Sequence, residues 1–109
     1  MKILLDECLP LDFRHHLPGH AVHTAEWAGL KGLKNGRLLQ QAESAGYDIF
    51  VTTDQGIPHQ QNLANRKISI LIIHSRTNQI EDSVAAVAAI LMELENIEPG
   101  QIGHVSGIL

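Results

Sequence analysis

Cysteine and aromatic residues are scarce in this 109-residue chain. Its single cysteine, Cys8, has no partner for an internal disulfide, which suits the reducing conditions of the cytoplasm. The aromatic side chains are one tryptophan, one tyrosine and two phenylalanines, so platforms for stacking nucleic-acid bases are few. We therefore expect a cytoplasmic protein whose fold does not depend on disulfides.

Long apolar runs are also missing. No segment approaches the roughly 18 uncharged apolar residues that a membrane-spanning helix needs, and an acid already at Asp6 argues against a cleaved signal peptide. Hydrophobic residues nevertheless make up 44% of the chain, enough to bury a core. The sequence predicts a single globular domain over residues 1–109, without a membrane partner.

Basic residues are absent from the end of the chain. No Lys or Arg follows Arg76, while residues 79–109 carry five acids. The net charge of -4 argues against a broad, nonspecific nucleic-acid binder. A local basic surface on the first two thirds of the chain stays open as an alternative.

Short apolar runs alternate with helical patterns along the whole chain. The helical patterns fall at 10–17, 36–45 and 79–95, with a shorter turn or helix at 58–64. The runs predict five strands, at 2–6, 20–25, 48–53, 68–73 and 101–108. This alternation is typical of an α/β fold with a mostly parallel central sheet of about five strands, covered by helices on both faces.

Acidic residues stand where two of these strands end. Asp6 and Glu7 follow directly on the first run, and Asp54 closes the third. Because the carboxyl ends of parallel strands share one edge, where open α/β sheets bind ligands, these carboxylates predict a divalent metal site. Adjacent strand residues point to opposite faces, so Asp6 and Glu7 share one ion only if the strand ends at Asp6. Glu43, about 12 Å along its helix from the edge, is predicted to be a solvated residue outside the site.

A glycine-rich loop, residues 26–36, leads into the second helix. The start of that helix belongs to the same edge, with Asn35 as its N-cap. Lys34 and Arg37, with Lys31, could hold an RNA phosphate beside the metal, or could simply be a solvated loop. Trp27 in this loop is either a core residue or a contact for a partner.

Two motifs resemble a known family. Segment 3–10 (ILLDECLP) resembles the opening of small bacterial PIN-like proteins of uncharacterised function, in which a strand runs into Asp-Glu-Asn-Leu-Pro. Segment 50–55 (FVTTDQ) resembles their Val-Thr-x-Asp strand end. The loop into residues 35–39 and the apolar strand at 68–73 fall where that family would place them. The resemblance covers nearly the whole chain.

This resemblance implies a three-layer α/β/α PIN-like fold and a metal-dependent ribonuclease, and many PIN domains are toxins of toxin–antitoxin pairs. It makes Asp6 and Asp54 the central ligands of Mg²⁺ or Mn²⁺, with Glu7 beside Asp6. Thr52 becomes the hydroxyl that supports the site. The metal would activate a water and stabilise charge on the RNA phosphate. The partners implied are RNA and a small antitoxin protein, and surplus apolar surface on the 79–95 helix would support an antitoxin or homodimer contact.

Two alternatives stay open. Many relatives carry an acid at the start of the second helix, whereas residues 34–37 here are Lys-Asn-Gly-Arg. A PIN-like binding or regulatory module that has lost catalysis would fit this departure. A phospho-receiver domain also begins with a strand ending in paired acids, and Asp54 would be its phosphoacceptor. Receivers, however, need a lysine at the end of the last strand, and no lysine follows Arg76.

Overall fold

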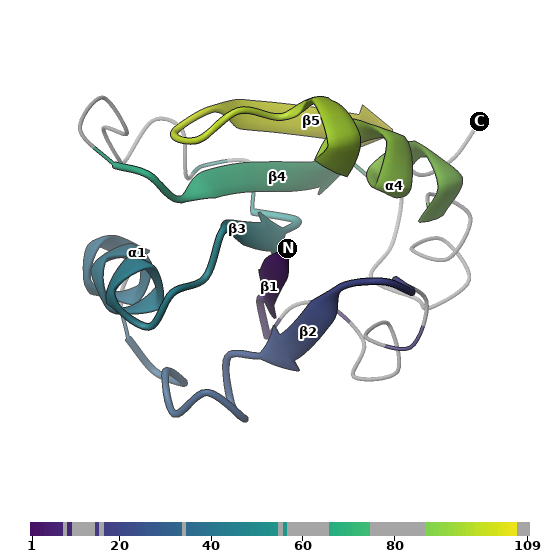
Figure 1. The fold of residues 1–109 in the computed structure, drawn as a ribbon. Helices are drawn as coiled ribbons and strands as arrows, with labels where there is room; N and C mark the ends of the chain where they lie inside the picture. Colours follow the sequence, from purple (N-terminus) through teal and green to yellow (C-terminus); the bar gives the residue numbers. More distant parts are fainter. Residues whose placement is uncertain are drawn as a thin grey trace.

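A five-stranded, all-parallel sheet forms the centre of the domain (Figure 1). The computed structural model describes residues 1–7, 9, 15, 17–33, 35–54, 56, 66–74 and 87–106. In spatial order the strands are β2 (Ala21–Thr24), β1 (Lys2–Leu5), β3 (Ile49–Thr52), β4 (Ser69–His74) and β5 (Ile102–Ser106). Helices α1 (Asn35–Ser44) and α4 (Val87–Asn96) lie on opposite faces. The predicted three-layer α/β/α architecture is confirmed.

The sheet has two separate hydrophobic cores because successive strand residues face opposite sides. In β1, Ile3 and Leu5 pack on the α4 side, whereas Leu4 packs on the α1 side. The same alternation continues through β3 and β4, whose apolar residues are buried on both faces. The uninterrupted aliphatic runs in the sequence are therefore strands covered on both sides, as predicted.

The helices cover the sheet with the apolar stripes that the sequence indicates. Leu38, Leu39 and Ala42 of α1 are buried, and the helix gives way to Gly46 in the left-handed conformation, with φ of +89°. Of the predicted 79–95 helix, the structure describes α4 from Val87 onward. The helical segments predicted at 10–17 and 58–64 lie almost entirely outside the described residues. Neither described helix is long and apolar enough to cross a bilayer.

Glu43 lies outside the predicted site, but it is not a solvated helix residue. Its Oε2 accepts hydrogen bonds from the backbone amides of Lys67, at 2.9 Å, and Ile68, at 3.2 Å. These amides stand at the entrance to β4, at the amino-terminal edge of the sheet. The carboxylate therefore joins α1 to the start of β4, far from the edge where Asp6 lies.

Tyr47 packs on the α1 side of the sheet and contacts the edge strand β2. The side chain is buried, and the Lys2 ammonium lies 4.4 Å from the centre of its ring. Its hydroxyl is hydrogen-bonded to Nδ1 of His23 at 2.9 Å. Burial disfavours the phenolate and raises the pKa of Tyr47 above its ordinary value.

Because Tyr47 is the chain's one tyrosine, its ionisation can be followed alone. We expect phenolate absorbance to appear at higher pH in the folded protein than in urea, where the pKa is about 10. The unfolded chain then loses its proton first, so the free energy of unfolding should fall as pH rises above about 10. Tyr47→Phe should remove this part of the pH dependence. Coincident titration of the folded and unfolded protein would contradict the burial of the hydroxyl.

Candidate functional site

The strand order creates a topological switch point between β1 and β3. From β1 the chain passes to β2 on one side, and it then returns across the sheet to β3 on the other side. Open α/β sheets bind ligands in the crevice outside the carboxyl ends of the strands at such a point. Asp6 directly follows β1, and Asp54 lies two residues beyond the end of β3. The two predicted acids therefore flank the switch point.

The hydroxyl of Thr52 links these two acids. Its Oγ1 donates a hydrogen bond to Oδ2 of Asp6 at 2.6 Å and accepts one from the backbone amide of Asp54 at 3.0 Å. The Thr52 side chain is fully buried. The Asp6 carboxylate and the Asp54 backbone thus contact the same oxygen atom, although they are far apart in the sequence.

The chain turns immediately after Asp6. Asp6 lies just past β1, and its amide still donates to the carbonyl of Val51 in β3 at 2.9 Å. The Glu7 amide turns back to donate to Oδ1 of Asp6 at 2.7 Å, and the Leu9 amide donates to the Asp6 carbonyl at 3.1 Å. Because the chain turns here, the side chains of Asp6 and Glu7 do not have to point to opposite faces of the sheet. Both residues line one cavity.

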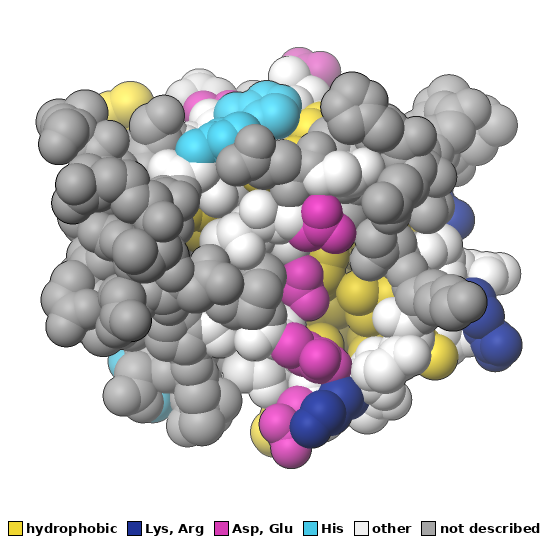
Figure 2. All heavy atoms as spheres, turned by 180° about the vertical axis from the view of Figure 1, so that it is seen from behind, with side chains coloured by type: hydrophobic (Ala, Val, Ile, Leu, Met, Phe, Trp, Pro, Cys, Tyr) yellow, Lys and Arg dark blue, Asp and Glu magenta, His cyan; other side chains and the backbone are white. Residues whose placement is uncertain are grey.

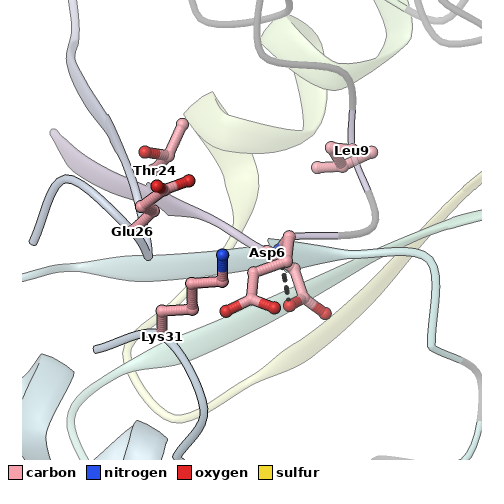
Figure 3. A pocket seen from close by; sticks show the side chains of 6 residues that line it. Asp6, Leu9, Thr24, Glu26 and Lys31 are labelled. Atoms are coloured by element: carbon pink, nitrogen blue, oxygen red, sulfur yellow. Dashed lines mark hydrogen bonds between the residues drawn. The ribbon is translucent and has the colours of Figure 1, made fainter. Parts of the chain in front are cut away.

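That cavity has a volume of about 420 Å³ and opens at the carboxyl edge of the sheet. Acidic side chains form a column across this face of the molecule (Figure 2). In Figure 3 the Lys31 ammonium extends toward the space between the Asp6 and Glu26 side chains. The described residues that line the cavity carry three carboxylates and one ammonium: Asp6, Glu7, Leu9, Thr24, Glu26 and Lys31.

Glu26 is a candidate site residue that sequence reasoning missed. It lies two residues beyond the end of β2, in a turn where the Trp27 amide donates to Oγ1 of Thr24 at 3.1 Å. The signal was the same as for Asp6 and Asp54, namely an acid just past a predicted strand. The reading of this segment as a glycine-rich basic loop obscured that signal.

Two other predicted site residues, Asp54 and Arg37, do not line this cavity. Asp54 is half-buried, and its Oδ1 accepts a hydrogen bond from the Gly56 amide at 2.9 Å, as in an Asx-turn. It is not among the described residues that line the cavity, and its connection to Asp6 runs through Thr52. Asn35 begins α1 and Arg37 is exposed in its first turn, whereas Lys34 lies outside the described residues.

The donor chemistry of this edge suits Mg²⁺ or Mn²⁺, because the acids supply only oxygen ligands. Within the described part of the chain, no three or more His, Cys, Asp or Glu side chains form a group that could hold a metal ion. Mg²⁺ does not require such a cage, since it commonly binds through one or two carboxylates, several waters and a substrate phosphate. The carboxylates at this edge are therefore ligands of the kind that such an ion takes, together with waters.

Replacing Thr52 tests the link between the two acids. Thr52→Val should lower the free energy of unfolding by about 2 kcal/mol, because it removes a buried hydroxyl that donates to a carboxylate. Thr52→Ser keeps the hydroxyl and should lose only about 1 kcal/mol, for one buried methyl group. Urea unfolding measures both values. A valine variant at least as stable as the serine variant would show that the hydrogen bonds do not hold this edge together.

No protein-family model, curated protein or solved structure matches the chain.

Proposed function

We propose that this protein is a metal-dependent ribonuclease of PIN-like type, which hydrolyses RNA phosphodiesters with Mg²⁺ or Mn²⁺. The observation that carries the proposal is the Thr52 hydroxyl, which joins the Asp6 carboxylate to the Asp54 backbone beside the switch point. The resemblance in the sequence assigns metal binding to the same two acids. Topology, hydrogen bonding and sequence motif thus favour one location.

The charges around the cavity explain why a cation is needed. Asp6, Glu7 and Glu26 outnumber the single ammonium of Lys31 on its described wall, so the cavity by itself repels an RNA phosphate. When bound, the metal supplies an activated water and neutralises charge on the phosphate. Lys31, which the sequence grouped with Lys34 and Arg37 as a phosphate contact, lines this cavity and would hold a phosphate oxygen.

Glu26 favours the enzyme over a PIN-like module that has lost catalysis. The sequence argument for lost activity was the absence of an acid at residues 34–37. Glu26 brings a carboxylate to the same edge from the end of β2. Glu26 thus joins Asp6 and Glu7 on the wall of one cavity, and a single Mg²⁺ ion commonly binds through one or two carboxylates and several waters.

The physiological role follows only from the resemblance. By that resemblance, we propose that the protein is a toxin whose partner is a small antitoxin protein. A homodimer is a second proposed assembly. Met92, which is 66% exposed on α4, is the apolar side chain that either contact would cover. RNA cleavage itself does not depend on this assignment.

A phospho-receiver is the second candidate, because receivers share the strand order 2-1-3-4-5. Asp54 beyond β3 would then accept a phosphoryl group. Against this reading, β5 ends at Ser106 and no lysine follows it in the sequence to meet the phosphoryl group. Labelling of Asp54 by acetyl phosphate would support the receiver, and no labelling would support the nuclease.

The nuclease proposal predicts divalent-dependent cleavage of RNA. Asp6→Asn and Asp54→Asn should each lower the rate about 100-fold or more, the scale expected when a charge-stabilising group is lost. Glu95→Gln is the matched control, because Glu95 is an exposed acid on α4, away from the cavity. Cleavage is measured with purified protein, labelled RNA and Mn²⁺, with EDTA as the blank. Equal rates in all three variants would exclude this site as the source of the activity.

A further inference from the structure

Trp27 is the most exposed large hydrophobic side chain among the described residues, at 67%. The sequence left open whether it is a core residue or a partner contact, and this exposure excludes the core. Its backbone is nevertheless well fixed. The Trp27 amide donates to Oγ1 of Thr24, and the amide of the next residue, Ala28, donates to the Thr24 carbonyl at 3.0 Å. An ordered turn thus holds an indole in solvent.

The indole is also held by a stack of rings that reaches into the core. The His23 ring lies 4.1 Å from the Trp27 ring, with an angle of 23° between the planes. Nδ1 of His23 is hydrogen-bonded to the hydroxyl of buried Tyr47, and these two rings meet edge to face at 5.8 Å. Because the stack fixes the indole in advance, a ligand that covers it pays little entropy for ordering the side chain.

This stack adjoins the acidic cavity. A second cavity, of about 460 Å³, is lined by Val22, His23, Thr24 and Trp27. Thr24 lines both cavities, and Glu26 of the acidic cavity is the residue next to Trp27. A ligand with a phosphate in one cavity therefore has the aromatic stack directly beside it.

The distribution of exposed apolar side chains favours a nucleobase over a protein surface as the ligand of this stack. The other exposed large hydrophobic side chains in the described residues are Met1, before β1, and Met92, on α4. Among the described residues, Trp27 is therefore not part of a broad apolar patch of the kind a stable protein interface needs. Every nucleobase, in contrast, offers a flat face that stacks on an aromatic ring, whatever the sequence.

We propose that the Trp27–His23 stack is a base-stacking platform, which holds an unpaired base of single-stranded RNA while the adjoining phosphate occupies the cavity of Asp6, Glu26 and Lys31. This inference rests on the proposed function, because it uses that site as the phosphate position. It adds a substrate class: single strands, since the bases of a duplex are already stacked and cannot reach the indole. Sequence preference should be weak, because stacking does not read base edges.

Tryptophan fluorescence tests the platform directly, because Trp27 is the chain's one tryptophan. Full-length protein is titrated with a short oligoadenylate in Ca²⁺, and a gel verifies that the RNA stays intact. The indole emission should be quenched in a saturable way. An oligonucleotide of equal length with abasic residues keeps the phosphates, and it should quench less and bind more weakly.

Variants separate stacking from general stability. By anisotropy of labelled RNA, Trp27→Ala should weaken binding about tenfold, and Trp27→Phe should recover most of the loss. Met92→Ala is the matched control, because its side chain is equally exposed at 66% on another element, and it should bind like the unchanged protein. Since the Trp27 side chain lies largely in solvent, its removal should leave the urea midpoint nearly unchanged.

Several outcomes would overturn the platform: no binding, unchanged emission on binding, equal quenching by the abasic oligonucleotide, or equal affinities of the alanine variants. A concentration-dependent dimer that Trp27→Ala abolishes would show that a second copy covers the indole instead. Base-dependent quenching without any cleavage would refute the nuclease and keep the platform. Cleavage at an unchanged rate by the Trp27→Ala variant would refute the platform and keep the nuclease.

Discussion

A single buried hydroxyl holds together the two strand ends on which the site depends. Thr52 donates to the Asp6 carboxylate and accepts from the Asp54 amide, and its side chain has no exposure to solvent. Hydrogen bonds to a carboxylate are stronger than neutral ones, and their geometry is correspondingly well defined. The fold thus fixes one acid against the end of the neighbouring strand before any ligand binds, at the position where this topology has its crevice.

The charge balance beside this link determines what the edge can bind. Carboxylates dominate the cavity wall, and Lys31 supplies its one described cation. A phosphate alone is repelled, and a metal ion alone competes with the ammonium. Under the proposed function, a metal ion and an RNA phosphate bound together would satisfy both the carboxylates and the ammonium. In the proposed platform, Trp27 lines a cavity that shares Thr24 with the acidic cavity and would stack on the base attached to that phosphate.

Periodicity and strand-end position were sufficient to predict the architecture and the placement of Asp6 and Asp54 at one edge of the sheet. Aliphatic runs identify buried strands whatever their neighbours, and a parallel sheet then collects their carboxyl ends at one edge. The same rule missed Glu26 because glycines and lysines dominated the reading of its loop. The roles of Glu43 and Trp27 were not readable, since each depends on residues distant in sequence: two amides at the entrance to β4 in one case, an aromatic stack in the other.

Paramagnetic broadening by Mn²⁺ tests most directly whether this edge binds a divalent cation. Small amounts of Mn²⁺ are added to isotopically labelled protein, and the backbone amide signals are followed by NMR. The account predicts that the amides of Asp6, Glu7, Glu26 and Asp54 broaden first, and that excess Mg²⁺ reverses the effect. Broadening centred elsewhere, for example on the His74–His104 pair with its nitrogens 2.9 Å apart, would contradict it, as would uniform weak broadening of all signals.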